Sequence, residues 1–257
     1  MKFKRNSYFI SLKKPIYIPR SKYYLLDAIQ QDLAMHNELQ KNCKRGVLIE
    51  GESGWGKSTF YRAILEQNGF IENSTDPKKC FRVINGGDPD AAERLINAFH
   101  AGEKVILEEA NLEPSLEILL IQLLTGKDRE LKPALHAGFF VLASQNPSTE
   151  IARVSLSEAL YNRMHVLQAT PYSNVDLIEI ADYSGIKESA VDFVEAFNRL
   201  KKEKPLDVTM RLFFKTLELI IENTNHSKIR LNDIGFFNSS SAVITETTPK
   251  ITIPRLN

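Results

Sequence analysis

Two hydrophobic patterns alternate along residues 45–169. Short, nearly continuous apolar runs, typical of strands buried on both faces, occur at 46–50, 80–86, 104–110, 138–146 and 165–169. Between them, apolar residues recur every three or four positions, as on a helix with one buried face, at 57–69, 88–102, 113–126 and 156–164. This alternation predicts an α/β fold with a five-stranded parallel sheet between helices.

The pattern changes after Pro171. Three amphipathic stretches without strand signals follow, at 174–185, 188–204 and 207–223, and the end of the chain is rich in Ser, Thr and Pro. We therefore expect four parts: a basic N-terminal arm or strap at 1–22, an α/β core at 23–170, a small all-helical domain at 171–235, and a flexible tail or linker at 236–257.

Composition restricts the classes of partner and the cellular compartment that we expect for this chain. The net charge of +1 provides no global attraction to nucleic acid or membrane, and no apolar run is long enough to span a bilayer, so membrane insertion is not expected. Residues 1–22 carry seven basic side chains and no acid, which favours a solvated arm over contact with an acidic partner or nucleic acid. With Cys43 and Cys80 as the two cysteines, a reducing, cytoplasmic location is predicted.

The stretch "GESGWGKST" directly follows the first predicted strand and opens the first predicted helix. It fits G-x-x-x-x-G-K-[ST], in which glycines let backbone N–H groups surround phosphate oxygens, lysine reaches the β- and γ-phosphates and the hydroxyl binds Mg²⁺. An aromatic residue at the Trp55 position is more often a shape filler than a base-stacking group. The predicted cofactors are ATP and Mg²⁺, and the predicted binding residues are Gly51, Glu52, Ser53, Gly54, Trp55, Gly56, Lys57, Ser58 and Thr59.

Polar residues also end two later strands. Glu108 and Glu109 follow the third predicted strand, where parallel sheets bind ligands, and adjacent strand residues point to opposite faces. One acid is thus expected near the metal and the other near the attacking water. Asn146 ends the next strand, where its amide could contact both the γ-phosphate and water.

In order and spacing, these motifs resemble an AAA+ ATPase of the MoxR, midasin and dynein branch. The resemblance covers about residues 15–235 and rests on "GESGWGKST", "VILEEANLEPSLEILLIQLLTGKDRELK", "GFFVLASQNPS", "VSLSEALYNRM" and "VTMRLFFKTLEL". It implies that the helical segment 171–235 is the AAA+ lid.

The resemblance also implies the role of each site residue. Lys57 and Ser58 match the Walker A lysine and hydroxyl, with Ser58 and Glu108 at the metal. Glu109 matches the catalytic glutamate and Asn146 matches sensor 1. Arg163 matches an arginine finger that enters a neighbouring subunit's site, and Arg211 matches the sensor 2 arginine.

The sequence departs from this branch in three ways. Glu108 stands where aspartate is usual, the hairpin before "GFFV" is contracted, and there is no room for an insert in the second helix. The expected function is Mg²⁺-dependent ATP hydrolysis that remodels a macromolecular partner, a protein rather than nucleic acid. It would take place in a homo-oligomer or beside a tandem AAA+ neighbour. Two alternatives stay open: a nucleotide-dependent switch or scaffold with little hydrolysis, and a nucleic-acid remodelling ATPase.

A short sequence motif occurs near both ends of the chain. "PIYIPR" at 15–20 and "KITIPR" at 250–255 both contain I-x-I-P-R, and the residue before proline favours an extended backbone. If the repetition of this motif is not coincidence, it predicts an extended strap that leads into this module and a second strap that leads into a following module.

Overall fold

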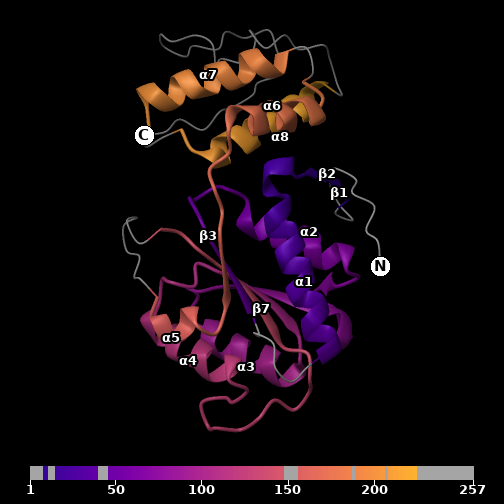
Figure 1. The fold of residues 1–257 in the computed structure, drawn as a ribbon, viewed down its shortest axis with the longest axis vertical. Helices are drawn as coiled ribbons and strands as arrows, with labels where there is room; N and C mark the ends of the chain where they lie inside the picture. Colours follow the sequence, from indigo (N-terminus) through magenta and orange to yellow (C-terminus); the bar gives the residue numbers. More distant parts are fainter. Residues whose placement is uncertain are drawn as a thin grey trace. The chain divides into compact units, whose positions relative to one another are not determined.

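The computed structural model describes residues 8–10, 15–39, 46–147, 156–186, 189–205 and 208–224. The chain divides into two compact units, Met1–Pro171 and Tyr172–Asn257. In Figure 1 the first unit holds a sheet flanked by helices and the second is helical.

The sheet of the first unit has six strands, and every neighbouring pair is parallel. This confirms the predicted parallel α/β fold, with one strand more than the five expected. The additional strand, β4, is two residues long and lies at the edge of the sheet, which leaves too few positions for a periodic signal. The spatial order is β4 (Ile71–Glu72), β5 (Cys80–Asn85), β6 (Lys104–Glu108), β7 (Phe140–Gln145), β3 (Gly46–Glu50), β8 (His165–Gln168).

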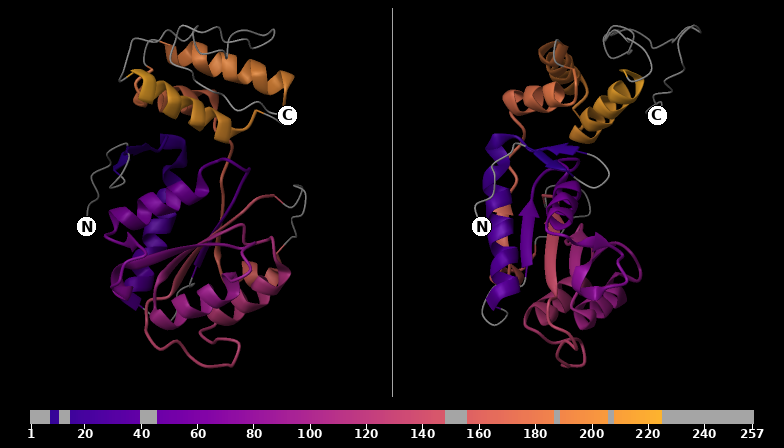
Figure 2. Two further views of the ribbon diagram at one scale, coloured as in Figure 1. Left: turned by 180° about the vertical axis from the view of Figure 1, so that it is seen from behind. Right: turned by 90° about the vertical axis from the view of Figure 1, so that its right-hand side faces the viewer.

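Helices cover both faces of this sheet (Figures 1 and 2). One face carries α1 (Tyr23–Leu39) and α2 (Lys57–Gln67), and the other carries α3 (Ala91–Ala101), α4 (Pro114–Leu124) and the short α5 (Glu158–Tyr161). Helix α1 is not among the predicted elements, although its buried residues Leu25, Ile29 and Leu33 recur every four positions. That spacing is the helical signal from which α1 could have been predicted.

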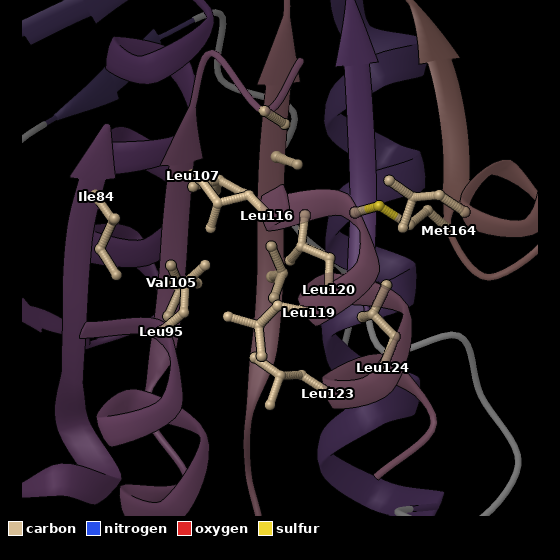
Figure 3. Close-up of a cluster of buried hydrophobic side chains, with 14 of the residues drawn as sticks. Ile84, Leu95, Val105, Leu107, Leu116, Leu119, Leu120, Leu123, Leu124 and Met164 are labelled. Carbon is tan, nitrogen blue, oxygen red and sulfur yellow. The ribbon is translucent and has the colours of Figure 1, made fainter. Parts of the chain in front are cut away.

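The main core lies between the sheet and α3–α5. Alternate strand residues such as Val105 and Leu107 of β6 point to this side, where the leucines of α4 pack against them (Figure 3). Leu119, Leu120 and Leu123 are at most 1% exposed. Burial of these side chains fixes the register of the strands and with it the positions of the loops at their carboxyl ends.

The N-terminal segment is partly described. Strand β1 (Tyr8–Ile10) pairs antiparallel with β2 (Pro15–Tyr17), and the short 3-10 helix η1 (Arg20–Lys22) leads into α1. Lys22 differs from the expected solvated arm, since it is 2% exposed. Five of the seven basic residues lie outside the described residues. The second copy of the I-x-I-P-R motif, at 250–255, also lies outside them, so the tandem interpretation stays a prediction.

The described part of the second unit contains α6 (Asn174–Tyr183), α7 (Ala190–Glu203) and α8 (Met210–Thr224). Its core is aromatic: the ring centroid of Phe213 lies 5.1 Å from that of Phe193 and 4.9 Å from that of Phe197. No helix among the described residues is both long and apolar enough to cross a membrane.

Helix α4 provides a direct test of the core. Leu120→Ala should lower the free energy of unfolding by about 2–5 kcal/mol, because it leaves a cavity under a fully buried side chain. Ile118→Ala on the same helix removes a side chain that is 66% exposed and should cost about 0.5 kcal/mol or less. Urea unfolding of both variants measures the difference, and equal losses would contradict this packing.

Candidate functional site

The loop 51–59 joins the carboxyl end of β3 to the amino end of α2. Gly54 and Gly56 have φ angles of 75° and 92°, in the left-handed region where other residues are strained. Gly56 directly precedes α2, so the N–H groups of the first helical turn follow the loop. Such a helix terminus favours an anion. Within the loop, Glu52, Ser53 and Thr59 are exposed and Ser58 is half-buried.

Lys57 is buried at the centre of this arrangement. Its Nζ donates to Gly51 O at 2.5 Å, to Glu52 O at 2.9 Å and to Asn146 Oδ1 at 2.9 Å. The amide of Asn146 in turn donates from Nδ2 to Glu109 Oε1 at 3.1 Å. One side chain therefore connects the loop lysine with the glutamate predicted to be catalytic.

The strand order explains this meeting of distant residues. Strand β7 lies between β3 and β6, and parallel strands end at the same edge of a sheet. Gly51, Asn146 and Glu109 each follow the last residues of one of these three strands. The structure thus brings together the three predicted site residues Lys57, Asn146 and Glu109.

The turn after β6 has an unusual backbone. Glu109 has a φ of 57°, a conformation that costs free energy for a residue other than glycine and that often occurs at functional sites. Two bonds to the carboxyl end of β7 and the residue after it hold the turn: Ala110 N donates to Ser144 O at 3.0 Å, and Asn111 Nδ2 donates to Asn146 O at 3.1 Å. Asn111 is 3% exposed, so its buried amide links the turn after β6 to the backbone of Asn146.

The sequence does not single out two residues that shape this turn, one within it and one beside it. Asn111 appears in the resemblance only as part of the "N-L" pair after the glutamates. Gly86 follows β5 and donates from its N to Glu108 O at 2.7 Å, and a Cβ at this position would lie 2.5 Å from Glu109 O. The glycine in "INGG" is the sequence signal for this close approach.

The indole of Trp55 points inward rather than toward solvent. It is 3% exposed, packs edge-on against Phe60 at a centroid distance of 6.0 Å, and donates from Nε1 to Thr170 O at 3.0 Å. The same carbonyl accepts from Lys22 Nζ at 3.0 Å, and Lys22 also donates to Thr170 Oγ1 and Pro171 O. This placement favours the shape-filling interpretation of Trp55 over base stacking.

The remaining predicted residues lie elsewhere. Glu108 is half-buried at the end of β6, and Arg163 is half-buried just after α5, where its Nη1 donates to Ala159 O at 2.6 Å. Arg211 is exposed on α8 of the second unit. Within the first unit, the contact of Arg163 with Ala159 therefore does not join it to the loop.

Two of the predicted site residues carry oxygen donors that suit a hard cation. Ser58 and Glu108 offer a hydroxyl and a carboxylate, the ligand types that Mg²⁺ takes. Among the described residues, no three His, Cys, Asp or Glu side chains are grouped so that they could hold a metal alone.

Comparison with known proteins supports the AAA+ resemblance. No family model matches the chain. In an alignment of 156 positions that covers 52% of this chain, the sequence is 31% identical to midasin from Giardia intestinalis. The chain covers 3% of that protein's length, so the activity of midasin as a whole does not transfer. This match, on a parallel α/β fold with the loop 51–59, supports an AAA+ module without singling out the MoxR branch.

Three solved structures are similar at low identity. A lysine-to-arginine mutant of RuvB from Thermotoga maritima has a TM-score of 0.48 and 14% identity, with 82% of this chain and 73% of that chain covered. An arginine-to-alanine mutant of the same protein has a TM-score of 0.49, 15% identity and coverages of 88% and 83%. PCH-2 from C. elegans has a TM-score of 0.48, 14% identity and coverages of 80% and 71%. At this level of superposition the likeness says nothing of function.

The close approach at Gly86 leads to a prediction. Gly86→Ala should lower the free energy of unfolding by about 1–3 kcal/mol, because the added methyl group meets the backbone of Glu109. Gly87→Ala should cost less, since the nearest atom to its new Cβ is a side-chain methyl of Leu112 at 3.2 Å, which can move. Thermal unfolding of both variants provides the measurement, and a larger loss for Gly87→Ala would contradict the described turn.

Proposed function

We propose that this chain binds ATP with Mg²⁺ at the loop 51–59, hydrolyses it, and uses the cycle to remodel a protein partner. The observation that carries the proposal is the chain of contacts Lys57–Asn146–Glu109, which places a cation, an amide and a carboxylate at adjoining strand ends. The AAA+ likeness to midasin supports the same chemistry.

Each residue has a distinct part in the proposed reaction. The γ-phosphate takes the place of the oxygens that now surround Lys57, and the ammonium group stabilises its negative charge. Glu109 accepts a hydrogen bond from water and polarises it for in-line attack. The Asn146 amide orients that water against the phosphate without competing for its proton, and Asn111 keeps Asn146 in place.

Ser58 and Glu108 are the residues that would hold Mg²⁺. The ion, when bound, neutralises charge on the β- and γ-phosphates. Glutamate at position 108 reaches one methylene further than the aspartate usual in this class. We therefore expect a different placement of the carboxylate and slower turnover, which is also what favours the alternative of a nucleotide-dependent switch.

We propose that Arg163 of one module completes the site of the neighbouring module. It lies on the turn after α5, and the resemblance assigns it to the phosphate of the next subunit. We therefore propose a homo-oligomer, or a tandem arrangement, in which hydrolysis requires two modules. The proposed sensor 2 role of Arg211 would complete the site from the second unit.

The proposal favours a protein partner in a reducing compartment. The net charge of +1 provides no overall attraction to nucleic acid, whose binding draws on positive charge. We propose a reducing environment such as the cytoplasm because the sequence contains two cysteines, Cys43 and Cys80.

The first test separates binding from chemistry. Glu109→Gln should bind ATP yet hydrolyse it at least about 100-fold more slowly, because an amide polarises water poorly. Lys57→Ala should already fail at binding. Equilibrium titration with a fluorescent ATP analogue and phosphate release measure the two steps, and Glu93→Gln on the exposed surface of α3 serves as the matched control.

The outcomes of this test are distinct. Normal turnover by Glu109→Gln would remove Glu109 from the catalytic role. A wild-type protein that binds ATP but turns over no faster than Glu109→Gln would indicate the nucleotide-dependent switch. Turnover that requires added DNA or RNA would indicate the nucleic-acid remodelling alternative.

The second test concerns Arg163. Its replacement by alanine should lower turnover by roughly 10³–10⁵-fold, the range of arginine fingers in other phosphoryl-transfer enzymes. Mixing Arg163→Ala with Lys57→Ala should restore part of the activity, since a mixed interface pairs an intact loop with an intact arginine. Co-assembly is checked by particle mass. If the two variants co-assemble and activity does not return at any ratio, Arg163 does not act in trans.

A further inference from the structure

Tyr161 ends α5 and is bonded to two strand ends. Its hydroxyl donates to Glu50 Oε1 at 2.6 Å and accepts from Gln145 Nε2 at 2.9 Å. The Glu50 carboxylate also accepts from the side chains of Gln145 and Gln168. Burial and the neighbouring Glu50 raise the pKa of Tyr161, so the hydroxyl stays protonated and donates.

The bonds of Tyr161 and those of Lys57 use successive residues of the same two strands. Glu50 and Gln145 are paired in register on β3 and β7, on the face that α5 covers. The next residues, Gly51 and Asn146, lie on the face of α2 and hold Lys57. One pair of strands therefore holds the loop lysine on one face and α5 on the other.

The rest of α5 is anchored as well. Ser157 N donates to Glu117 Oε1 of α4 at 2.7 Å, and Leu160 and Met164 are at most 1% exposed. Arg163 lies between these buried residues on the turn that follows Tyr161, and its side chain is half-exposed. The direction in which Arg163 points is thus set by how α5 is fixed, and Tyr161 is the polar link at its carboxyl end.

We propose that Tyr161, held by Glu50 and Gln145, is a positioning residue that sets the orientation of Arg163 toward the neighbouring module. This inference rests on the proposed function, in which Arg163 acts in trans. Tyr161 does not touch the nucleotide itself. Glu50 and Gln145 directly precede the residues that hold Lys57. A shift of the ends of β3 and β7 in one module would therefore also change the orientation of Arg163 toward the site of the neighbouring module.

The experiment uses the full chain and Tyr161→Phe, which removes only the hydroxyl. We expect kcat for ATP hydrolysis to fall about 10- to 100-fold with KM within about twofold, since small displacements of a catalytic group have effects of this size. Mixing with Lys57→Ala should restore part of the activity, because the Lys57→Ala subunit supplies a well-placed Arg163 and Tyr161→Phe supplies an intact loop. A residue that merely supports its own nucleotide site would not be rescued in this way.

Tyr24→Phe is the matched control. The Tyr24 hydroxyl donates to Gln168 O of β8 at 2.6 Å, so this variant also loses one tyrosine hydrogen bond near the same strand but leaves α5 untouched. It should keep wild-type kcat. If Tyr161→Phe does not fold, as judged by thermal unfolding, Glu50→Gln replaces it. That variant weakens the acceptor of the hydroxyl and should show a smaller loss with the same rescue.

The outcomes separate this inference from the proposed function. Wild-type kcat in Tyr161→Phe overturns the inference. A loss in Tyr161→Phe that Lys57→Ala does not rescue, while Arg163→Ala is rescued, also overturns it and assigns Tyr161 to its own site. If Arg163→Ala is not rescued either, the role of Arg163 in trans falls and the inference falls with it. A wild-type protein without ATP hydrolysis contradicts the proposed function itself.

Discussion

The parallel pairing of β7 between β3 and β6 is the constraint on which the site depends. These strands come from three separate stretches of sequence, and their register is fixed by apolar residues buried on both faces of the sheet. Because parallel strands end at one edge, Lys57, Asn146 and Glu109 meet without any long loop to position them. Rigid strands hold such groups more precisely than loops.

The alternation of side chains along these strands separates two tasks. Residues that face α2 surround the loop lysine, and residues that face α5 hold Tyr161. A displacement of β7 against β3 cannot alter one set of contacts without altering the other, since adjacent residues of a strand move together. In such a sheet, the contacts on the two faces are connected through the strands themselves.

The sequence predicted the fold and the three connected site residues, but not the geometry that joins them. The five long strands, the loop 51–59 and its following helix are local patterns, with signals carried by consecutive residues. Helix α1 had such a signal, which was not used, and β4 is too short to have one. The left-handed backbone at Glu109 and the approach of Gly86 to it arise from pairing between β5 and β6, so periodicity within either strand does not reveal them. The burial of Lys22 likewise depends on residues about 150 positions away.

Thr170 shows how the loop 51–59 is tied to the end of the first unit. Its carbonyl accepts from Trp55 of the loop and from Lys22 of the N-terminal segment, and the second unit begins two residues later. Both donors are buried, so neither bond is readily exchanged for water, and an unpaired buried N–H is costly. Any rearrangement of the loop that moves the indole must therefore carry Thr170 with it or break this bond. The last residues of the first unit are thus held to the loop 51–59 by this hydrogen bond.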